Sequence, residues 1–401
     1  MSEKKYKYII VGGGLAGASA AEEIRVNDKH GPILLIGSED EYPYHRPPLS
    51  KKLWFGQKKL EEIFVQNRDF YSANEIDVSL GTTIVSLDAD KKKLADDKGR
   101  SYIYDKLLLA TGGVPRKLSL PGGDSKDICY YRYITDYKKI RTRAAEGASA
   151  TVIGGGFIGS EIAAALNINK VKVTMVFPTA YICDRVFPDY LGNAIQKHFI
   201  EKGIRVLFGQ KPVSFSKSKN KIVTATDKGV RIESDILIAG IGIVPETSLA
   251  KQAGLTVDNG IVVNSFLQTS DPDIYAAGDN ADFPYQALGK HMRIEHWDNA
   301  LSQGKCAARN MTGIQEPFTY MPYFFSDLFE FGYEAVGEVD SQLQTYPDWE
   351  KENEKGVIYY LKDKRLRGVM LCNVWEKVEA ARELIRSGKV FDSRTLAGAV
   401  K

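Results

Sequence analysis

The sequence predicts an α/β protein, and three observations lead to that fold class. The 401-residue chain contains a unit made of a short apolar strand, a glycine-rich turn and an alanine-rich helix, and this unit recurs 142 residues later, at Gly154 after Gly12. Each copy is followed by a second apolar strand, an alternation typical of parallel sheets covered by helices. Hydrophobic residues make up 43% of the chain and charged residues 26%, which excludes a wholly disordered, collagen-like or coiled-coil protein.

Aliphatic and β-branched runs predict the strands, and alanine-rich or glutamate-rich stretches predict the helices. The predicted strands lie at 8–11, 33–36, 105–113, 150–153, 172–177, 234–242, 274–279, 356–361 and 366–372, and the predicted helices at 18–25, 160–166 and 377–386. From about residue 318 aromatic residues cluster and the alternation of strand and helix stops. We therefore expect a separate α+β domain at the C-terminal end.

Charge and cysteine content exclude several classes of function. Lys and Arg number 54 and Asp and Glu 51, so the net charge of +3 gives no reason to expect a nucleic-acid partner. Cys129, Cys183, Cys306 and Cys372 are too widely spaced for a CxxC motif or a zinc knuckle, and we expect inert, reduced thiols. No apolar run approaches the ~18 residues of a membrane helix, so membrane insertion is not expected. The short polar start of the chain predicts a cytoplasmic protein, if the natural chain begins at Met1.

The first glycine-rich turn predicts a dinucleotide site. Gly12, Gly14 and Gly17 form a GxGxxG pattern between the first predicted strand and helix. In such a pattern the first glycine allows the tight turn, the second lets the backbone approach a pyrophosphate, and the third lets helix and strand pack closely. The second strand should be followed by an acid that binds ribose hydroxyls, and Glu39 follows with Asp40 beside it.

The second turn repeats the pattern at Gly154, Gly156 and Gly159, but the acid is missing. The strand that follows ends at Phe177, and Arg185 lies slightly downstream, where it could meet a 2′-phosphate. The residues therefore leave NAD and NADP both open. Two such units predict two nucleotides, one a fixed flavin dinucleotide and one an exchangeable nicotinamide dinucleotide, with a hydride passing between them.

These residues resemble the pyridine-nucleotide flavoprotein reductases, which have the glutathione reductase-like fold. The motifs that carry the resemblance span essentially the whole chain, in the family's order, at 12–17, 110–113, 154–159 and 276–279. The stretches 43–51, 294–300, 326–328 and 332–334 resemble the branch that contains the apoptosis-inducing factors and the ferredoxin (rubredoxin) reductases. The resemblance implies an FAD-binding domain in two segments (1–114 and 241–316), an NAD(P)-binding domain at 115–240 and a C-terminal α+β domain at 317–401.

The resemblance also implies which residues bind the two cofactors. For FAD they are Gly12, Gly14, Ala16, Gly17, Glu39, Arg46, Lys51, Val85, Ala110, Thr111, Arg116, Gly278, Asp279, Glu295, His296, Trp297 and Phe325. For NADH or NADPH they are Gly154, Gly156, Phe157, Ile158, Gly159, Glu161, Arg185, Gly242 and Glu334.

Specific roles follow from the same resemblance. It implies that Glu39 binds the adenosine ribose, that Arg46 and Arg116 meet the FAD phosphates and linker, and that Asp279 binds the ribityl chain. Lys51, paired with Glu161, would lie beside the flavin N5, where a cation stabilises the charge that arrives on reduction. The carboxylate would keep Lys51 from being an unpaired buried charge.

Three aromatic or polar positions complete this picture. Phe157 resembles the family's aromatic gate over the flavin, and the segment Glu295, His296 and Trp297 would approach the flavin and the nicotinamide amide. Phe325 stands where apoptosis-inducing factors often have tryptophan, so stacking there should be weaker. A metal site at His291, Glu295 and His296 is not expected, because His291 and Glu295 share a face only in a helix and His296 then points elsewhere.

Departures from the family limit the chemistry. The disulfide reductases need a redox Cys-x4-Cys, and the peroxidase and coenzyme A disulfide reductase branch a single cysteine, but residues 39–59 contain none. Electrons should therefore leave the flavin directly, without a thiol. The chain also lacks the longer hairpin and the longer C-terminal insert of animal apoptosis-inducing factors, so their cell-death and DNA-binding roles are not expected.

The preferred hypothesis is an FAD-dependent NAD(P)H oxidoreductase that reduces a ferredoxin or rubredoxin, a quinone or oxygen, with Lys51 and Glu161 in supporting catalytic roles. The alternative is an interaction protein, similar to apoptosis-inducing factor, that forms a long-lived NADH-reduced complex and changes partners. The sequence does not decide between these acceptors, and it leaves a homodimer open.

Overall fold

The computed structural model describes residues 3–400, and the chain forms two compact units. The first unit contains the residues up to His45, Leu60–Val114 and Val244–Pro322. The second contains Arg46–Lys59, Pro115–Ile243 and the chain from Tyr323 onward. The short excursion Arg46–Lys59, which carries Arg46 and Lys51, thus belongs to the second unit.

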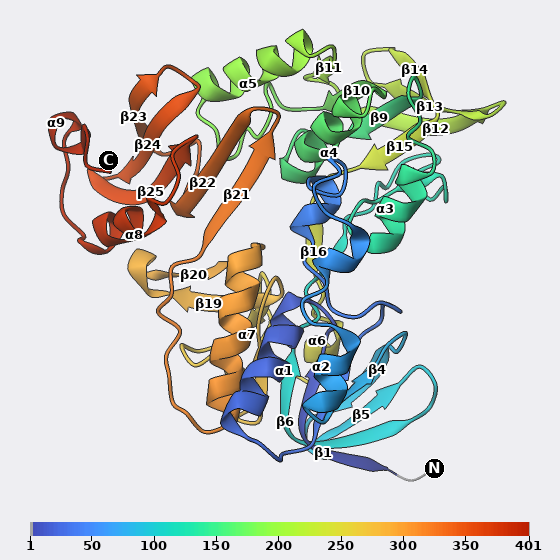
Figure 1. Ribbon diagram of the computed structural model, residues 1–401, viewed down its shortest axis with the longest axis vertical. Coiled ribbons are helices and arrows are strands. Elements are labelled where there is room, and N and C mark those ends of the chain that lie inside the picture. The colour runs from blue at the N-terminus through green and yellow to red at the C-terminus, as the bar shows by residue number, and fades with distance from the viewer. Residues whose placement is uncertain (1–2, 401) are drawn as a thin grey trace. The chain divides into compact units, whose positions relative to one another are not determined.

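A seven-stranded sheet forms the centre of the first unit (Figure 1). Along the sheet the strands are β3 (Ile76–Ser79), β2 (Ile33–Ile36), β1 (Lys4–Val11), β6 (Ser101–Leu109), β5 (Lys93–Asp96) and β4 (Ile84–Asp88), and β18 (Ile274–Ala276) also pairs with β6. Strands β1, β2, β3, β6 and β18 run parallel to one another, whereas β5 pairs antiparallel with β6 and with β4. Parallel strands with apolar runs are buried on both faces, as the sequence indicates.

Two helices of the first unit, α1 (Leu15–Asn27) and α7 (Trp297–Met311), lie side by side (Figure 1). They approach closely because Gly304 has no side chain: a Cβ there would lie 2.3 Å from the Ala16 carbonyl oxygen. The unit also contains η2 (Leu60–Ile63), α2 (Arg68–Ala73), α6 (Ser248–Gln252), η3 (Gln286–Leu288) and a small sheet of β17 (Ile261–Val262), β19 (Ala281–Tyr285) and β20 (Lys290–Arg293).

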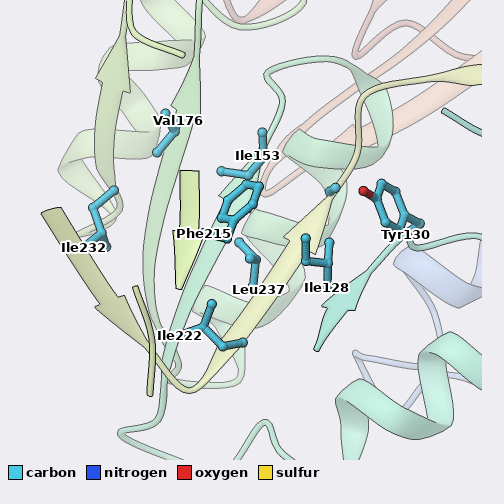
Figure 2. Close-up of a cluster of buried hydrophobic side chains, with 9 residues drawn as sticks. Ile128, Tyr130, Ile153, Val176, Phe215, Ile222, Ile232 and Leu237 are labelled. Carbon is cyan, nitrogen blue, oxygen red and sulfur yellow. The ribbon is translucent and has the colours of Figure 1, made fainter. Parts of the chain in front are cut away.

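The second unit has a parallel sheet ordered β11 (Arg205–Phe208), β10 (Lys172–Phe177), β9 (Ser149–Ile153), β15 (Ile236–Ala239) and β8 (Ile128–Cys129). Its helices are α3 (Ile134–Arg141), α4 (Phe157–Ile168) and α5 (Asp189–Glu201). A three-stranded sheet, β12 (Pro212–Ser218), β13 (Lys221–Thr226) and β14 (Arg231–Ser234), packs on the parallel sheet. Figure 2 shows the apolar core between them, in which Phe215 lies among Ile153, Val176 and Leu237.

The C-terminal part of the second unit is an antiparallel sheet with two helices, so the expected α+β domain is present. Its strands are ordered β21 (Tyr323–Leu328), β22 (Phe331–Gly337), β25 (Arg365–Cys372), β24 (Lys355–Lys362) and β23 (Gln344–Lys351), with α8 (Val378–Arg386) and α9 (Ser393–Leu396) after them. The remaining elements are η1 (Pro47–Ser50) and the paired short strands β7 (Gly113–Pro115) and β16 (Ile243–Pro245).

The expected strands and helices are all present, but several bounds were wrong. Helices α1 and α4 begin three residues before the predicted starts, because Gly14 and Gly156 themselves serve as the N-caps. Three strands end earlier than predicted: β6 ends at Leu109, β15 at Ala239 and β18 at Ala276. In each case a glycine with positive φ follows within three residues (Gly112, Gly242 and Gly278), and this conformation turns the chain out of the strand.

No helix formed by residues 3–400 combines the length and the apolar character needed to cross a lipid bilayer.

Candidate nucleotide-binding and redox site

The first glycine turn of the first unit has the shape that a pyrophosphate requires. Gly12 has φ +131°, and a Cβ there would lie 2.0 Å from the carbonyl oxygen of Ala110; a Cβ on Gly17 would lie 2.0 Å from the carbonyl oxygen of Gly12. At Gly14, by contrast, no atom lies within 4 Å of an added Cβ. The first and third glycines are therefore needed for packing, and the second faces open space at the N-terminus of α1, where backbone N–H groups favour an anion.

The second unit repeats this arrangement around α4. A Cβ on Gly154 would lie 2.3 Å from the Gly240 carbonyl oxygen and one on Gly159 would lie 2.2 Å from the Gly154 carbonyl oxygen, whereas nothing surrounds Gly156. Helical hydrogen bonding begins with the amide of Ser160, which donates to the Gly156 carbonyl. The N–H groups of the first turn therefore have no helical acceptor and can bind a second phosphate group.

The residues after the second strand of each unit differ, as the sequence indicates. Glu39 follows β2 and accepts a hydrogen bond of 2.6 Å from the Tyr44 hydroxyl. In the second unit β10 ends at Phe177 with no acid directly after it, and Arg185 is an exposed residue in the loop before α5. The Arg185 side chain is exposed, and the carboxylate of the adjacent Asp184 lies close enough to interact with its charge.

The small-residue segments of the first unit are held by polar side chains that the sequence analysis missed. The Asn280 amide donates to the Leu109 carbonyl and to the Thr111 hydroxyl, each at 3.0 Å, and the Gly278 amide donates to the Gln303 side-chain oxygen at 2.8 Å. Both Asn280 and Gln303 are fully buried. Their signal in the sequence is weak, because nothing in a local pattern distinguishes a buried amide from an exposed one.

Ala16, Ala110, Thr111, Gly278 and Asp279 thus lie around the ends of β6 and β18 and the start of α1, in one part of the first unit. Ala16 fits there because it is small: a Cβ on Gly278 would lie 3.2 Å from the Ala16 Cβ. Val85 is half exposed on β4, and no described contact gives it a role.

The segment before α7 has a defined hydrogen-bonding pattern. The Arg293 guanidinium donates to the Glu295 carboxylate at 2.5 Å, and the Trp297 indole N–H donates to His45 Nδ1 at 2.9 Å. Removal from water lowers the pKa of His296, the N-cap of α7, to about 4, and the nearby Asp279 carboxylate opposes that shift. His296 is therefore neutral at pH 7.

A metal at this segment is not supported. His291 lies on β20, which ends at Arg293, so the helical face that would have joined His291 to Glu295 does not form. No group of three His, Cys, Asp or Glu side chains in the described part of the chain could hold a metal ion.

The second unit contains a buried ion pair. The Lys51 ammonium lies 3.1 Å from the Glu161 carboxylate, and the two residues are only 4% and 6% exposed. Lys51 also lies 4.5 Å from the centre of the Phe325 ring, 3.4 Å from the Phe325 carbonyl oxygen and 3.9 Å from the Asp327 carboxylate. The predicted Lys51–Glu161 contact is thus present, and Phe325 lies beside it.

The segment that carries Lys51 is held by aromatic side chains of the same unit. The Trp54 indole N–H donates to the Tyr131 hydroxyl at 2.9 Å, and that hydroxyl donates to the Leu49 carbonyl at 2.5 Å. Burial raises the pKa of Tyr131 well above its ordinary value, so it remains a neutral donor. This network fixes the position of η1 and of the residue that follows it, Lys51.

The other predicted residues of the second unit are more dispersed. Arg46 lies over the Tyr133 ring at 5.2 Å and donates to the Arg132 carbonyl, while Arg116 is exposed. Phe157, the first residue of α4, packs against Phe324 with ring centres 5.4 Å apart. Ile158 is exposed, Gly242 accepts the Arg116 amide through its carbonyl, and burial raises the pKa of the half-buried Glu334.

The cysteine thiols are all buried, although the Cys183 backbone amide donates to the carbonyl of Gly155 in the second glycine turn at 2.8 Å. Cys129, Cys183, Cys306 and Cys372 are all buried and unpaired, and burial raises the pKa of each thiol. A buried thiol with a raised pKa is a poor nucleophile, which agrees with the expectation that these thiols are inert.

A cavity of about 480 Å³ opens elsewhere in the second unit. It is lined by the first residues of β9, β10 and β11, among them Ser149, Lys172 and Arg205. Because the Gly154 turn lies at the opposite, carboxyl ends of these strands, the cavity is not the predicted nucleotide site.

Two glycine turns each open a helix, and an acidic residue directly follows the next strand in only one of the two units, an arrangement typical of a protein with two different dinucleotide sites. Residues 6–304 match the pyridine nucleotide-disulphide oxidoreductase family, and residues 307–354 and 347–387 match the C-terminal family "Apoptosis-inducing factor, mitochondrion-associated, C-term". The chain therefore belongs to the pyridine nucleotide-disulphide oxidoreductases and is an FAD-dependent NAD(P)H oxidoreductase.

The individual relatives of this chain have names that describe different functions. The chain is 35% identical to mitochondrial apoptosis-inducing factor 1 of Dictyostelium discoideum, over 97% of this chain and 80% of the relative. It is 34% identical to monodehydroascorbate reductase 3 of Arabidopsis thaliana, over 92% and 90%. It superimposes on the covalent putidaredoxin reductase–putidaredoxin complex with a TM-score of 0.92 and 32% identity, over 99% of this chain and 96% of that one. The predicted fold class, glutathione reductase-like with two Rossmann-type domains, is confirmed.

Proposed function

We propose that this protein transfers electrons from NAD(P)H through FAD to a small iron–sulfur protein of the ferredoxin or rubredoxin type. The observation that carries the proposal is the near-complete likeness to a reductase that was solved in complex with its small redox partner. The cysteine-free stretch 39–59 also supports it, because electrons then have no thiol through which to leave the flavin.

The residues of the chain suit two nucleotides of different kinds. The backbone N–H groups at the start of α1 and the Glu39 carboxylate would hold the pyrophosphate and ribose of FAD, as the open space at Gly14 permits. Those at the start of α4 would hold the pyrophosphate of NAD(P)H. Bound FAD supplies the hydride and electron chemistry, and the protein supplies orientation and charge.

Lys51 is the residue whose charge matters most to this chemistry. Its ammonium is buried, and Glu161 keeps it from being unpaired. We propose that Lys51 stabilises the negative charge that reduction brings, and that Glu161 holds Lys51 in place. His296, which stays neutral at pH 7, would add no second cation.

The test begins with the yellow holoprotein under anaerobic conditions. NADH and NADPH are mixed with it separately in a stopped-flow instrument, and the bleaching of the flavin absorbance gives the rate of reduction. Lys51→Met, which keeps most of the length of the side chain but removes its charge, should retain FAD and bleach at least about tenfold more slowly. An unchanged bleaching rate would show that Lys51 has no such role.

The acceptor is then identified by turnover. A ferredoxin, a rubredoxin, a quinone, the ascorbyl radical and oxygen are offered in turn to the NADH-reduced protein. Fast reoxidation by one of the two iron–sulfur proteins supports the proposal, whereas preference for a small organic acceptor rejects it. Failure of both NADH and NADPH to bleach the flavin would reject the function altogether.

A second candidate function is favoured by the match of residues 307–387 to the apoptosis-inducing factor C-terminal family. In that case the NADH-reduced protein would persist in air for minutes and would change its binding partners. The same reoxidation experiment separates the two, because a reductase is reoxidised within its turnover time.

We also propose a cytoplasmic location, and we treat a homodimer as a hypothesis to be tested. Four free cysteines are typical of a reducing compartment and support a cytoplasmic location. The homodimer that the sequence leaves open is tested by sedimentation of the holoprotein at several concentrations.

A further inference from the structure

The Glu161 carboxylate is held by more than Lys51. The Ser50 hydroxyl donates to Glu161 Oε2 at 2.5 Å, and the Ser326 hydroxyl donates to Glu161 Oε1 at 2.5 Å. Oε1 is also the oxygen that lies 3.1 Å from Lys51 Nζ. Each carboxylate oxygen therefore has a hydroxyl donor, and one of them has the ammonium as well.

These donors come from three separate segments of the second unit. Ser50 ends η1 and is the residue before Lys51, Glu161 lies one helical turn after Phe157 on α4, and Ser326 lies on β21. Ser50 and Ser326 are 3% and 2% exposed, so neither hydroxyl has water as a ready alternative partner. Ser50 lies 3.5 Å from the Pro47 carbonyl oxygen, which is a much longer contact than the one to Glu161.

Two donors on opposite oxygens fix the rotation of a carboxylate group. A carboxylate that accepts only one bond can turn about its last C–C bond, whereas one bonded at both oxygens has a defined plane. In this protein the defined plane directs Oε1 at Lys51. The same two hydrogen bonds also satisfy both oxygens of a carboxylate that has little access to water.

We propose that Ser50 and Ser326 are positioning residues for the reduction of the flavin: they orient Glu161, and Glu161 orients Lys51. This inference rests on the proposed function, since it gives Lys51 its role in that reaction. The proposed positioning role differs from a purely structural role, in which the two serines would only stabilise the packing of η1 and β21 against α4.

The two roles make different predictions for combined variants. Ser50→Ala and Ser326→Ala should each slow flavin bleaching by NADH about fivefold or more in the otherwise unchanged holoprotein, whereas Ser326→Thr, which keeps a hydroxyl, should restore most of the rate. If the serines act through Glu161 on Lys51, Ser326→Ala should have less than about a twofold effect when Lys51→Met is already present. If the serine had only a structural role, Ser326→Ala would slow flavin bleaching by the same factor with and without Lys51→Met.

Ser234→Ala is the matched control. Ser234 is a buried serine of the same unit whose hydroxyl accepts from Thr151 at 3.0 Å, remote in the sequence from the proposed site. Its loss should lower thermal stability about as much as Ser326→Ala but leave the bleaching rate unchanged.

Each outcome bears on one proposal at a time. If Lys51→Met bleaches at the normal rate, the proposed function of Lys51 fails, and the positioning role fails with it. If Lys51→Met is slow but both serine variants bleach normally, only the positioning role is overturned. Equal rate factors in the two backgrounds, or a slow Ser234→Ala, would also overturn it, because a general loss of stability would then explain the effect.

Discussion

Removing both partners of the Lys51–Glu161 pair should destabilise the protein much less than the sum of the two single removals. In Lys51→Met the Glu161 carboxylate remains buried without its counter-ion and keeps only the hydroxyls of Ser50 and Ser326. In Glu161→Gln the ammonium remains buried and loses its counter-ion at 3.1 Å; it keeps the Asp327 carboxylate at 3.9 Å, the carbonyl and ring of Phe325, and the neutral amide oxygen of the new side chain. In the double variant no uncompensated charge is left.

The distance sets the expected size of the effect. Two unit charges 3.1 Å apart attract by about 5 kcal/mol at an effective dielectric constant of about 20, a gross value from which the cost of desolvation must be subtracted. Breaking one side of a buried pair costs about 3–5 kcal/mol of unfolding free energy. Because hydroxyls or Asp327 partly compensate each single variant here, we expect about 3 kcal/mol for each.

The double variant should lose at least about 2 kcal/mol less than the sum of the two single losses, since a buried pair can be replaced by neutral groups of similar volume at little cost. The free energy of unfolding of the unmodified protein, the two single variants and the double variant is measured by urea unfolding, followed by circular dichroism. A fixed excess of FAD keeps the stabilisation by bound ligand comparable in all four proteins. Losses that add within about 0.5 kcal/mol would refute the reasoning, because two residues in contact must show coupling.

Two further predictions concern the first unit. Gly17→Ala, whose Cβ would lie 2.0 Å from the Gly12 carbonyl oxygen, should lower the free energy of unfolding by about 3 kcal/mol or more. Gly14→Ala, whose Cβ would have nothing within 4 Å, should keep the fold and lose bound flavin. Thermal unfolding and the flavin content per chain measure the two effects, and equal destabilisation by the two variants would contradict the geometry. The folded-state pKa of about 4 for His296 lies below its ordinary value near 6.5, so stability is full above pH 6.5 and is lost as the pH falls toward 4. Between pH 7 and pH 5 the loss should be about 2 kcal/mol, and His296→Gln should remove it; an unchanged pH dependence in that variant would assign the loss to other groups.

Much of the fold follows from local pattern. The glycine spacing at 12–17 and 154–159, with strands before and after, is enough to predict both Rossmann-type units, because each glycine answers a local steric need of the turn. The missing acid after Phe177 and the missing cysteine at 39–59 are also read directly from the sequence. These features are local, and the sequence determines them by itself.

The Lys51–Glu161 pair was predicted from the family resemblance and not from the local sequence pattern, and neither of them predicted Ser50 or Ser326. Ser50 and Glu161 are separated by 111 positions in the chain, and Ser326 lies a further 165 positions beyond Glu161. Serine is common in turns and strands, so neither residue stands out before the fold brings it to the carboxylate. The same holds for Asn280 and Gln303, which become recognisable only once they are buried against the ends of β6 and β18.

The sequence alone determined that the chain has two glycine-rich turns, that an acidic residue follows the second strand of only one of the two units, and that residues 39–59 contain no cysteine. Only the tertiary structure decided that Arg46–Lys59 packs in the same unit as α4 and β21, so that a lysine, a glutamate and two serines meet. The physical reason is that turns and strand ends are set by the conformations of neighbouring residues. A buried charged cluster, in contrast, forms only where distant segments pack closely enough to exclude water.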